Sequence, residues 1–140
     1  MPTAMTQVHT PTTYLSAAVA FLGLDAIWLS TMAERLYRPA IGHLMQAQFD
    51  PWAALIFYVL YLIGVVQFAV RPGLLAARPV VALFSGALLG LVAYGTYDLT
   101  NQATLKDWPW VVTLTDLAWG AFVTGTAAWA ACTVALRRAR

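Results

Sequence analysis

Four long apolar runs, separated by short segments rich in charge and proline, divide this chain. The runs cover residues 14–33, 52–70, 80–100 and 110–136. A run of roughly 20 residues forms a helix of about 30 Å, the thickness of a bilayer's hydrocarbon core. The runs are continuous and do not alternate with polar residues, which disfavours a transmembrane β-barrel. The pattern predicts an all-α integral membrane protein, a four-transmembrane-helix antiparallel bundle that forms a single domain.

The segments between the runs are predicted to be connections. Residues 1–13 are expected to be loosely ordered, and residues 34–50 indicate an aqueous or interfacial loop. Asp50 and Pro51 suit the N-cap and first position of the second helix. Proline inside a helix removes a hydrogen bond and clashes with the preceding turn. All seven prolines lie outside the predicted helices or in their first turn, which supports this partition.

Composition and charge restrict the class of protein further. Hydrophobic residues make up 61% and charged residues 10%, and the mean hydropathy is +0.69, which is outside the range of soluble domains. The net charge of +2 is too small to indicate a nucleic-acid partner. The lipid bilayer is the predicted partner, and a homo-oligomer is compatible with the sequence.

Basic residues favour one end of the predicted bundle. One end holds Arg71, Arg78, Arg137, Arg138 and Arg140, and the other holds Arg35, Arg38 and Lys106. Basic residues accumulate on the cytoplasmic side of membrane proteins, so both termini are predicted to be cytoplasmic.

The third run carries small and polar residues on one helical face. These are Gly86, Gly90, Tyr94, Tyr97 and Asn101, with Asp98 at the edge of the face. Small residues in a membrane helix usually mark contact with another helix. Gly90 is therefore expected to pack closely, whereas Gly73, in a predicted turn, is expected to tolerate a larger side chain.

Three aspartates lie within the predicted helices: Asp25, Asp98 and Asp116. The predicted topology places all three in the outer half of the bundle. Burying an aspartate at the centre of a membrane helix costs roughly 2.5–3.5 kcal/mol, so these residues are functional candidates. They are predicted to share one outward-opening cavity with tyrosines and to retain at least one proton near neutral pH. The predicted ligand- or proton-binding set is Asp25, Asp98, Asp116, Tyr94, Tyr97, Asn101, Tyr58, Tyr61, Trp28 and Trp119.

Each acid also has a purely structural interpretation. Asp116 could cap a shorter fourth helix, where the helix dipole favours an acid. Asp98 could lie at an interface beside a frayed helix end. Asp25 could hydrogen-bond across helices without any further role.

Four segments resemble a known family of bacterial membrane proteins. They are LDAIWL from Leu24, FYVLYLIG from Phe57, YGTYDLTNQATLKDWP from Tyr94 and TDLAWG from Thr115. They are similar to the hallmark segments of domain of unknown function family 2177. The resemblance implies a four-helix protein of the bacterial inner membrane with no established activity. Its members are often encoded beside lipid-modifying methyltransferases, which implies a link to acyl-chain or envelope chemistry.

Three classes of function remain open. The first, which intramembrane acids fit best, is binding or transport of a small cationic or protonatable ligand. The second is a membrane enzyme or accessory factor in lipid acyl-chain modification, using Asp and Tyr as acid and base. The third is a non-catalytic envelope scaffold. No H-E-x-x-H, C-x-x-C, P-loop or G-x-S-x-G motif is present, so no metal site is predicted and the cofactor stays open.

Overall fold

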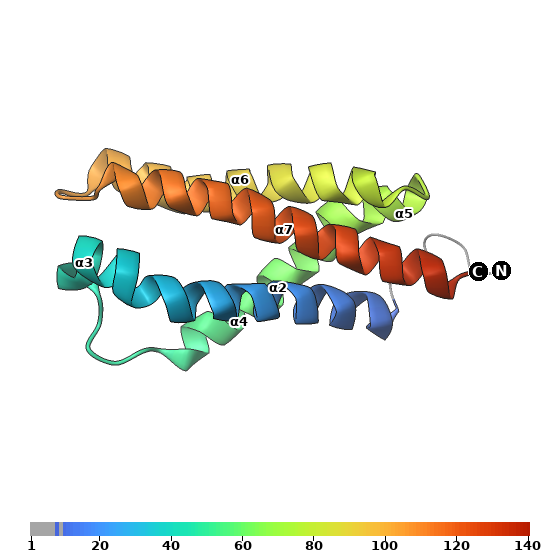
Figure 1. The fold of residues 1–140 in the computed structure, drawn as a ribbon, viewed down its shortest axis with the longest axis horizontal. Coiled ribbons are helices and arrows are strands. Elements are labelled where there is room, and N and C mark those ends of the chain that lie inside the picture. Colours follow the sequence, from blue (N-terminus) through green and yellow to red (C-terminus); the bar gives the residue numbers. More distant parts are fainter. Residues whose placement is uncertain (1–7, 9) are drawn as a thin grey trace.

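The computed structural model describes residue 8 and residues 10–140 and forms a bundle of four long helices (Figure 1). The first consists of α2 (Pro11–Met32), η1 (Ala33–Tyr37), α3 (Arg38–Ile41) and η2 (Gly42–Leu44). The second consists of α4 (Pro51–Val65), η3 (Val66–Val70) and α5 (Arg71–Leu75), followed by α6 (Pro79–Thr104) and α7 (Trp110–Arg138). Each of the four is long and apolar enough to cross a membrane. The predicted fold class is confirmed.

The first helix is longer at both ends than the apolar run predicted. It begins at Pro11 with Thr10 as its N-cap, so part of the segment expected to be loosely ordered is helical. The rest of that prediction, residues 1–7 and 9, lies outside the described residues. The loop predicted over residues 34–50 is wrong for residues 34–44, where the helix continues to Leu44, and is confirmed only for residues 45–50. Its charged residues stay on the exposed helix surface, where Arg38 pairs with Glu34 at 2.8 Å.

Two prolines lie inside the long helices, contrary to the prediction that all seven avoid them. Pro39 and Pro72 each follow a π-helical turn and an arginine. In these turns the N–H of Arg38 bonds to the carbonyl of Ala33, and that of Arg71 bonds to Val66. The wider turn changes the hydrogen-bond partners just where a proline would clash with the preceding turn of an α-helix. The second helix therefore runs on to Leu75.

Helices α6 and α7 pack side by side along their length (Figure 1). Glycines make this approach possible, as the stripe on the third run predicted. A Cβ atom on Gly90 would lie 1.9 Å from the carbonyl oxygen of Gly120, and one on Gly86 would lie 2.7 Å from that of Thr124. The expectation for Gly73 is wrong, because this residue lies in α5 and a Cβ there would be 2.7 Å from that of Ala82.

Helix α4 crosses the other helices obliquely (Figure 1). Most side chains in its first ten residues are exposed, whereas η3 and α5 bury Val66, Ala69, Val70 and Leu74 against the bundle. Asp50 caps the start of α4 as predicted, accepting from the N–H groups of Trp52 at 3.0 Å and Ala53 at 3.3 Å. The second long helix is thus anchored at its end and loosely packed at its start.

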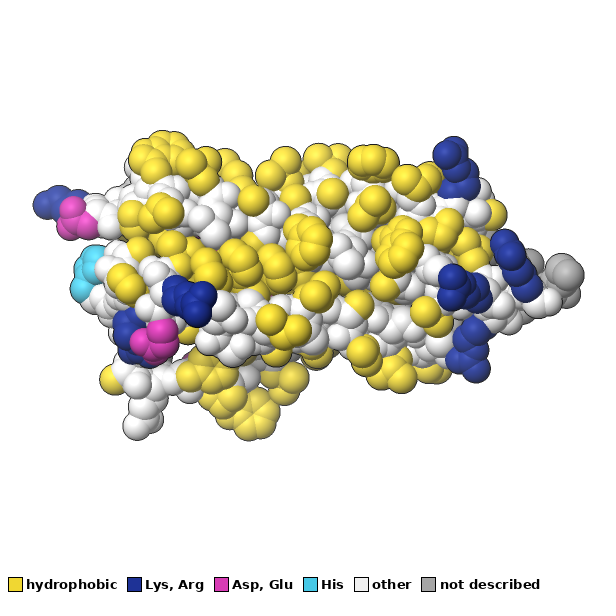
Figure 2. Space-filling view, viewed as in Figure 1, with side chains coloured by type: hydrophobic (Ala, Val, Ile, Leu, Met, Phe, Trp, Pro, Cys, Tyr) yellow, Lys and Arg dark blue, Asp and Glu magenta, His cyan; other side chains and the backbone are white. Residues whose placement is uncertain are grey.

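The two ends of the bundle differ in charge (Figure 2). One end, here called the basic end, includes Arg78, Arg137, Arg138 and Arg140 and lies beside both the start of α2 and the end of α7. The other, here called the mixed end, carries both signs of charge, with Glu34, Arg35, Arg38, His43, Asp50, Lys106 and Asp107. Exposed apolar side chains cover the surface between the ends.

Candidate functional site

Asp25 lies in α2 and is buried between α4 and α7. Its Oδ2 accepts a hydrogen bond from the Tyr58 hydroxyl at 2.5 Å, and its Oδ1 accepts one from the Trp119 indole at 3.2 Å. Only 6% of the residue is exposed. Both carboxyl oxygens are therefore satisfied by donors from other helices, as the burial of a charge requires.

Asp116 lies well inside α7, which begins at Trp110, so it does not cap that helix. Its Oδ1 accepts from the Tyr37 hydroxyl at 2.5 Å, and the Trp28 indole donates to the same hydroxyl at 2.9 Å. Tyr37 stands in the π-helical segment η1, which carries its side chain back toward α7. A chain of two hydrogen bonds therefore joins α2 to the acid on α7.

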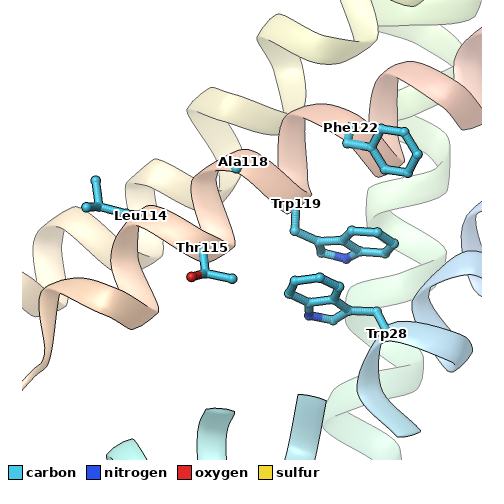
Figure 3. A pocket seen from close by; sticks show the side chains of 6 residues that line it. All are labelled: Trp28, Leu114, Thr115, Ala118, Trp119 and Phe122. Carbon is cyan, nitrogen blue, oxygen red and sulfur yellow. The ribbon is translucent and has the colours of Figure 1, made fainter. Parts of the chain in front are cut away.

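The rings of Trp28 and Trp119 stack between these two acids, with centroids 4.3 Å apart and planes inclined by 8°. Figure 3 shows the pair within a groove along α7, with Leu114 and Thr115 on one side of it and Phe122 on the other. The groove has a volume of about 510 Å³, and the remaining lining residues are Leu114, Thr115, Ala118 and Phe122.

Asp98 is the most completely buried acid, with an exposed fraction of 0%. It lies six residues before the end of α6 and so is not at a frayed terminus. Within the described part of the chain, neither of its carboxyl oxygens receives a hydrogen bond from a donor. The Asp116 carboxyl lies within hydrogen-bonding range. Two carboxylates have no proton to share, so this contact becomes a hydrogen bond only when one of them is protonated.

Asp98 and Asp116 line a common pocket of about 470 Å³. Its other walls are Phe57 of α4 together with Ala93, Tyr94 and Tyr97 of α6. We call this the Asp98–Asp116 pocket. Asp25 is not among its lining residues, but Tyr94 lies close enough to Asp25 and Asp116 to interact electrostatically with both. The structure thus brings two of the predicted acids into one pocket, and the prediction that Asp25 shares it is wrong, because Asp25 is held by Tyr58 and Trp119 outside its lining.

Of the other predicted residues, Tyr61 lies next to the pocket, with its ring 6.4 Å from that of Tyr94. The Tyr61 hydroxyl lies 2.8 Å from that of Thr124, inside the bundle. Tyr97 is 59% exposed and packs edge-on against Trp108, with the Asn101 side chain beside its hydroxyl. The buried face of α6 therefore runs through Asp98, which the helical projection had placed at the edge, and not through Tyr97.

The sequence that forms this site also matches a known protein family. A family model described as "Predicted membrane protein (DUF2177)" matches residues 10–133. The chain belongs to this family. Comparisons with curated proteins and with solved structures found no match. For this DUF2177 protein, the family description confirms the membrane class that the sequence predicted.

Sequence reasoning missed Tyr37 as a partner of Asp116 in this DUF2177 protein. The residue stands among Glu34, Arg35 and Arg38, and that charge indicated a loop outside the membrane. Nine residues make about two and a half turns of an α-helix, which would place Tyr37 on the face opposite Trp28. The hydrogen bond between them therefore depends on the π-helical turn at residues 33–37, which the local sequence does not reveal.

The donor set of the site favours a cation without identifying a metal centre. Among residues 8 and 10–140, no group of three or more His, Cys, Asp or Glu side chains is placed to hold a metal ion. The Asp98–Asp116 pocket combines two carboxyls with three aromatic rings. Such a pocket can accept a hydrogen-bond donor or a positive charge at Asp98, with aromatic faces around it.

Proposed function

We propose that this membrane protein binds a small cationic or protonatable ligand in the Asp98–Asp116 pocket, as a binding protein or a transporter. The observation that carries the proposal is the Asp98 carboxyl, which is fully buried and has no donor within the described residues. A buried carboxylate needs a partner that donates hydrogen bonds or carries positive charge. Asp116 beside it increases the attraction for a cation.

The walls of the pocket favour an organic cation over a bare metal ion. Phe57, Tyr94 and Tyr97 present aromatic rings, and the negative faces of such rings attract ammonium groups. Metal ions such as Ca²⁺ need six to eight oxygen ligands, which the two carboxyls do not supply.

The carboxyl–tyrosine pairs support a structural role better than the acid–base chemistry of a lipid-modifying enzyme. In both pairs the tyrosine hydroxyl already donates to its aspartate, Tyr58 to Asp25 and Tyr37 to Asp116. Each pair joins two helices, which fits a structural role that positions the pocket. Asp98 is the acid that these contacts leave available.

The orientation that accompanies this proposal places the basic end in the cytoplasm. The pocket, which lies nearer the mixed end, would then be in the outer half of a bacterial inner membrane. A ligand would reach it from the periplasmic side or from the outer leaflet.

The proposal is tested with the full chain in lipid nanodiscs and tetramethylammonium as the probe. A ligand that binds the folded state raises the unfolding temperature. We expect this rise in the wild-type protein and its loss in Asp98→Asn. Asp107→Asn is the matched control, because this exposed loop residue has a φ of 59°, which asparagine accepts. Equal shifts in Asp98→Asn and the control would overturn the proposal.

A further inference from the structure

A second groove continues from the Asp98–Asp116 pocket along the space between α4 and α6. Its volume is about 350 Å³, and it shares Phe57 and Ala93 with the pocket. Beyond these shared residues its lining includes Leu60, Ile63, Phe68 and Leu89 and is apolar except for Tyr61, whose hydroxyl is paired with that of Thr124 inside the bundle. We call it the α4–α6 groove. The two spaces together form one elongated site with a charged end and an apolar end.

The α4–α6 groove follows from how α4 packs. Helix α4 is anchored through η3 and diverges toward the mixed end, which leaves Leu60 and Ile63 exposed beside α6. Gly64 lines the same groove, and a Cβ atom there would have Phe68 at 3.9 Å as its nearest neighbour. From Phe57 to Phe68 the helix rises about 16 Å, so the apolar part is long enough for an extended alkyl chain.

We infer that the natural ligand is a single-chain amphiphile, with a cationic amino or quaternary ammonium head at Asp98 and an alkyl chain along the α4–α6 groove. This inference rests on the proposed function and names its substrate class. The carboxyls complement the positive head, and Phe57 and Ala93 border both compartments. The apolar part is lined by exposed side chains of a membrane-spanning helix, so the chain can enter sideways from the bilayer while the head reaches the acids.

The charge of the head follows from the same geometry. An anionic head would face Asp98 and Asp116, and like charges in a poorly solvated pocket repel strongly. The alkyl chain alone gives no reason to leave the bilayer, because lipid is as apolar as the groove. Recognition therefore requires the cationic head and the chain together.

The test measures binding by calorimetry in nanodiscs, with empty nanodiscs subtracted. The probes are tetramethylammonium (head alone), decyltrimethylammonium (head and chain) and decyl sulfate (chain with an anionic head). Because an alkyl chain concentrates any ligand in the bilayer, affinity in the wild-type protein does not locate the chain. The deciding variants are Gly64→Leu, which fills the groove, and Gly23→Leu, whose Cβ has no atom within 4 Å on exposed α2 surface.

We expect Gly64→Leu to weaken decyltrimethylammonium binding about tenfold or more, because the added side chain occupies the chain's space. Its affinity for tetramethylammonium should be unchanged, and Gly23→Leu should behave as wild type with both probes. Decyl sulfate should not bind specifically to any of the proteins. Equal decyltrimethylammonium affinity in the two glycine variants, or specific binding of decyl sulfate, overturns this inference while the small-cation site stands. Failure of tetramethylammonium to bind the wild-type protein overturns the proposed function as well.

Discussion

The indole N–H of Trp119 donates to Asp25 at 3.2 Å, while its ring stacks on Trp28. Trp28 in turn donates to Tyr37, whose hydroxyl donates to Asp116. Each tryptophan stands three residues after an aspartate on its own helix and hydrogen-bonds toward the aspartate of the other helix. The two D-x-x-W segments therefore join α2 to α7 reciprocally, once directly and once through Tyr37.

Tyr37→Phe tests the hydroxyl that completes this link. The change leaves the Trp28 indole without its acceptor and removes the donor to Asp116. We expect the free energy of unfolding to fall by about 1–2 kcal/mol, as for a lost buried hydrogen bond. Denaturant unfolding of the purified protein measures it. Tyr97→Phe, at a residue that is 59% exposed, is the control. An equally large fall in its free energy of unfolding would show that the hydrogen bonds of the Tyr37 hydroxyl do not stabilise the fold.

Two of the acids should respond to neutralisation in opposite ways. Asp98→Asn should raise the unfolding temperature, because an amide beside Asp116 supplies the donor that Asp98 lacks. Asp25→Leu should lower it, because Tyr58 and Trp119 both lose their acceptor, at about 1–3 kcal/mol for each unpaired group. Thermal unfolding without ligand measures both.

Asp25→Asn separates shape from charge at the same position. The amide oxygen can still accept one of the two hydrogen bonds, so the fold should be retained with a smaller loss of stability than in Asp25→Leu. If Asp98→Asn were less stable than Asp25→Asn, Asp98 would be satisfied in the folded protein, and the reason to assign it a cation would disappear.

The apolar runs predicted the four helices because membrane burial is set by local hydropathy. They failed where local sequence and tertiary structure disagree. Charged residues after Met32 indicated an exit from the membrane helix, yet Arg38 and Glu34 pair on the helix surface. Pro39 and Pro72 indicated breaks, yet each follows a π-helical turn that accommodates it. Local composition does not reveal such turns.

The candidate site could be predicted as a set of residues but not as a geometry. The expectation that intramembrane acids face protein predicted burial of Asp25, Asp98 and Asp116, which the structure shows. Which acid lies at the centre depends on helix rotation. Residues four apart on α6 keep to one buried face through Gly90 and Asp98, whereas Tyr97 turns outward. That rotation is set by the glycine contacts with α7, which a single-helix projection does not contain.

Helix contacts at the glycines give a graded prediction. Gly90→Ala should destabilise the bundle by about 1–3 kcal/mol or more, because even one methyl group would meet the Gly120 carbonyl at 1.9 Å. Gly73→Leu should also destabilise, because Ala82 and Cys132 lie within 3 Å of its Cβ position. Gly23→Leu should be close to neutral. Thermal unfolding of the three variants orders them, and a Gly90→Ala protein as stable as Gly23→Leu would mean that α6 and α7 do not pack through this face.

The last prediction is the orientation of the bundle in the membrane. The basic end carries more arginine than the mixed end carries arginine and lysine, and acids weigh little in the positive-inside rule. Reporter fusions after Ala77 and after Arg140 should therefore both be cytoplasmic, and a fusion near Gln48 should be periplasmic. A Gln48→Cys protein should react with a membrane-impermeant maleimide in intact cells, and the wild type is its control because Cys132 is buried. A periplasmic fusion at Ala77 would place the mixed end inside the cell. The Asp98–Asp116 pocket would then take its ligand from the inner leaflet, whereas the binding measurements in nanodiscs, which are open on both faces, would be unaffected.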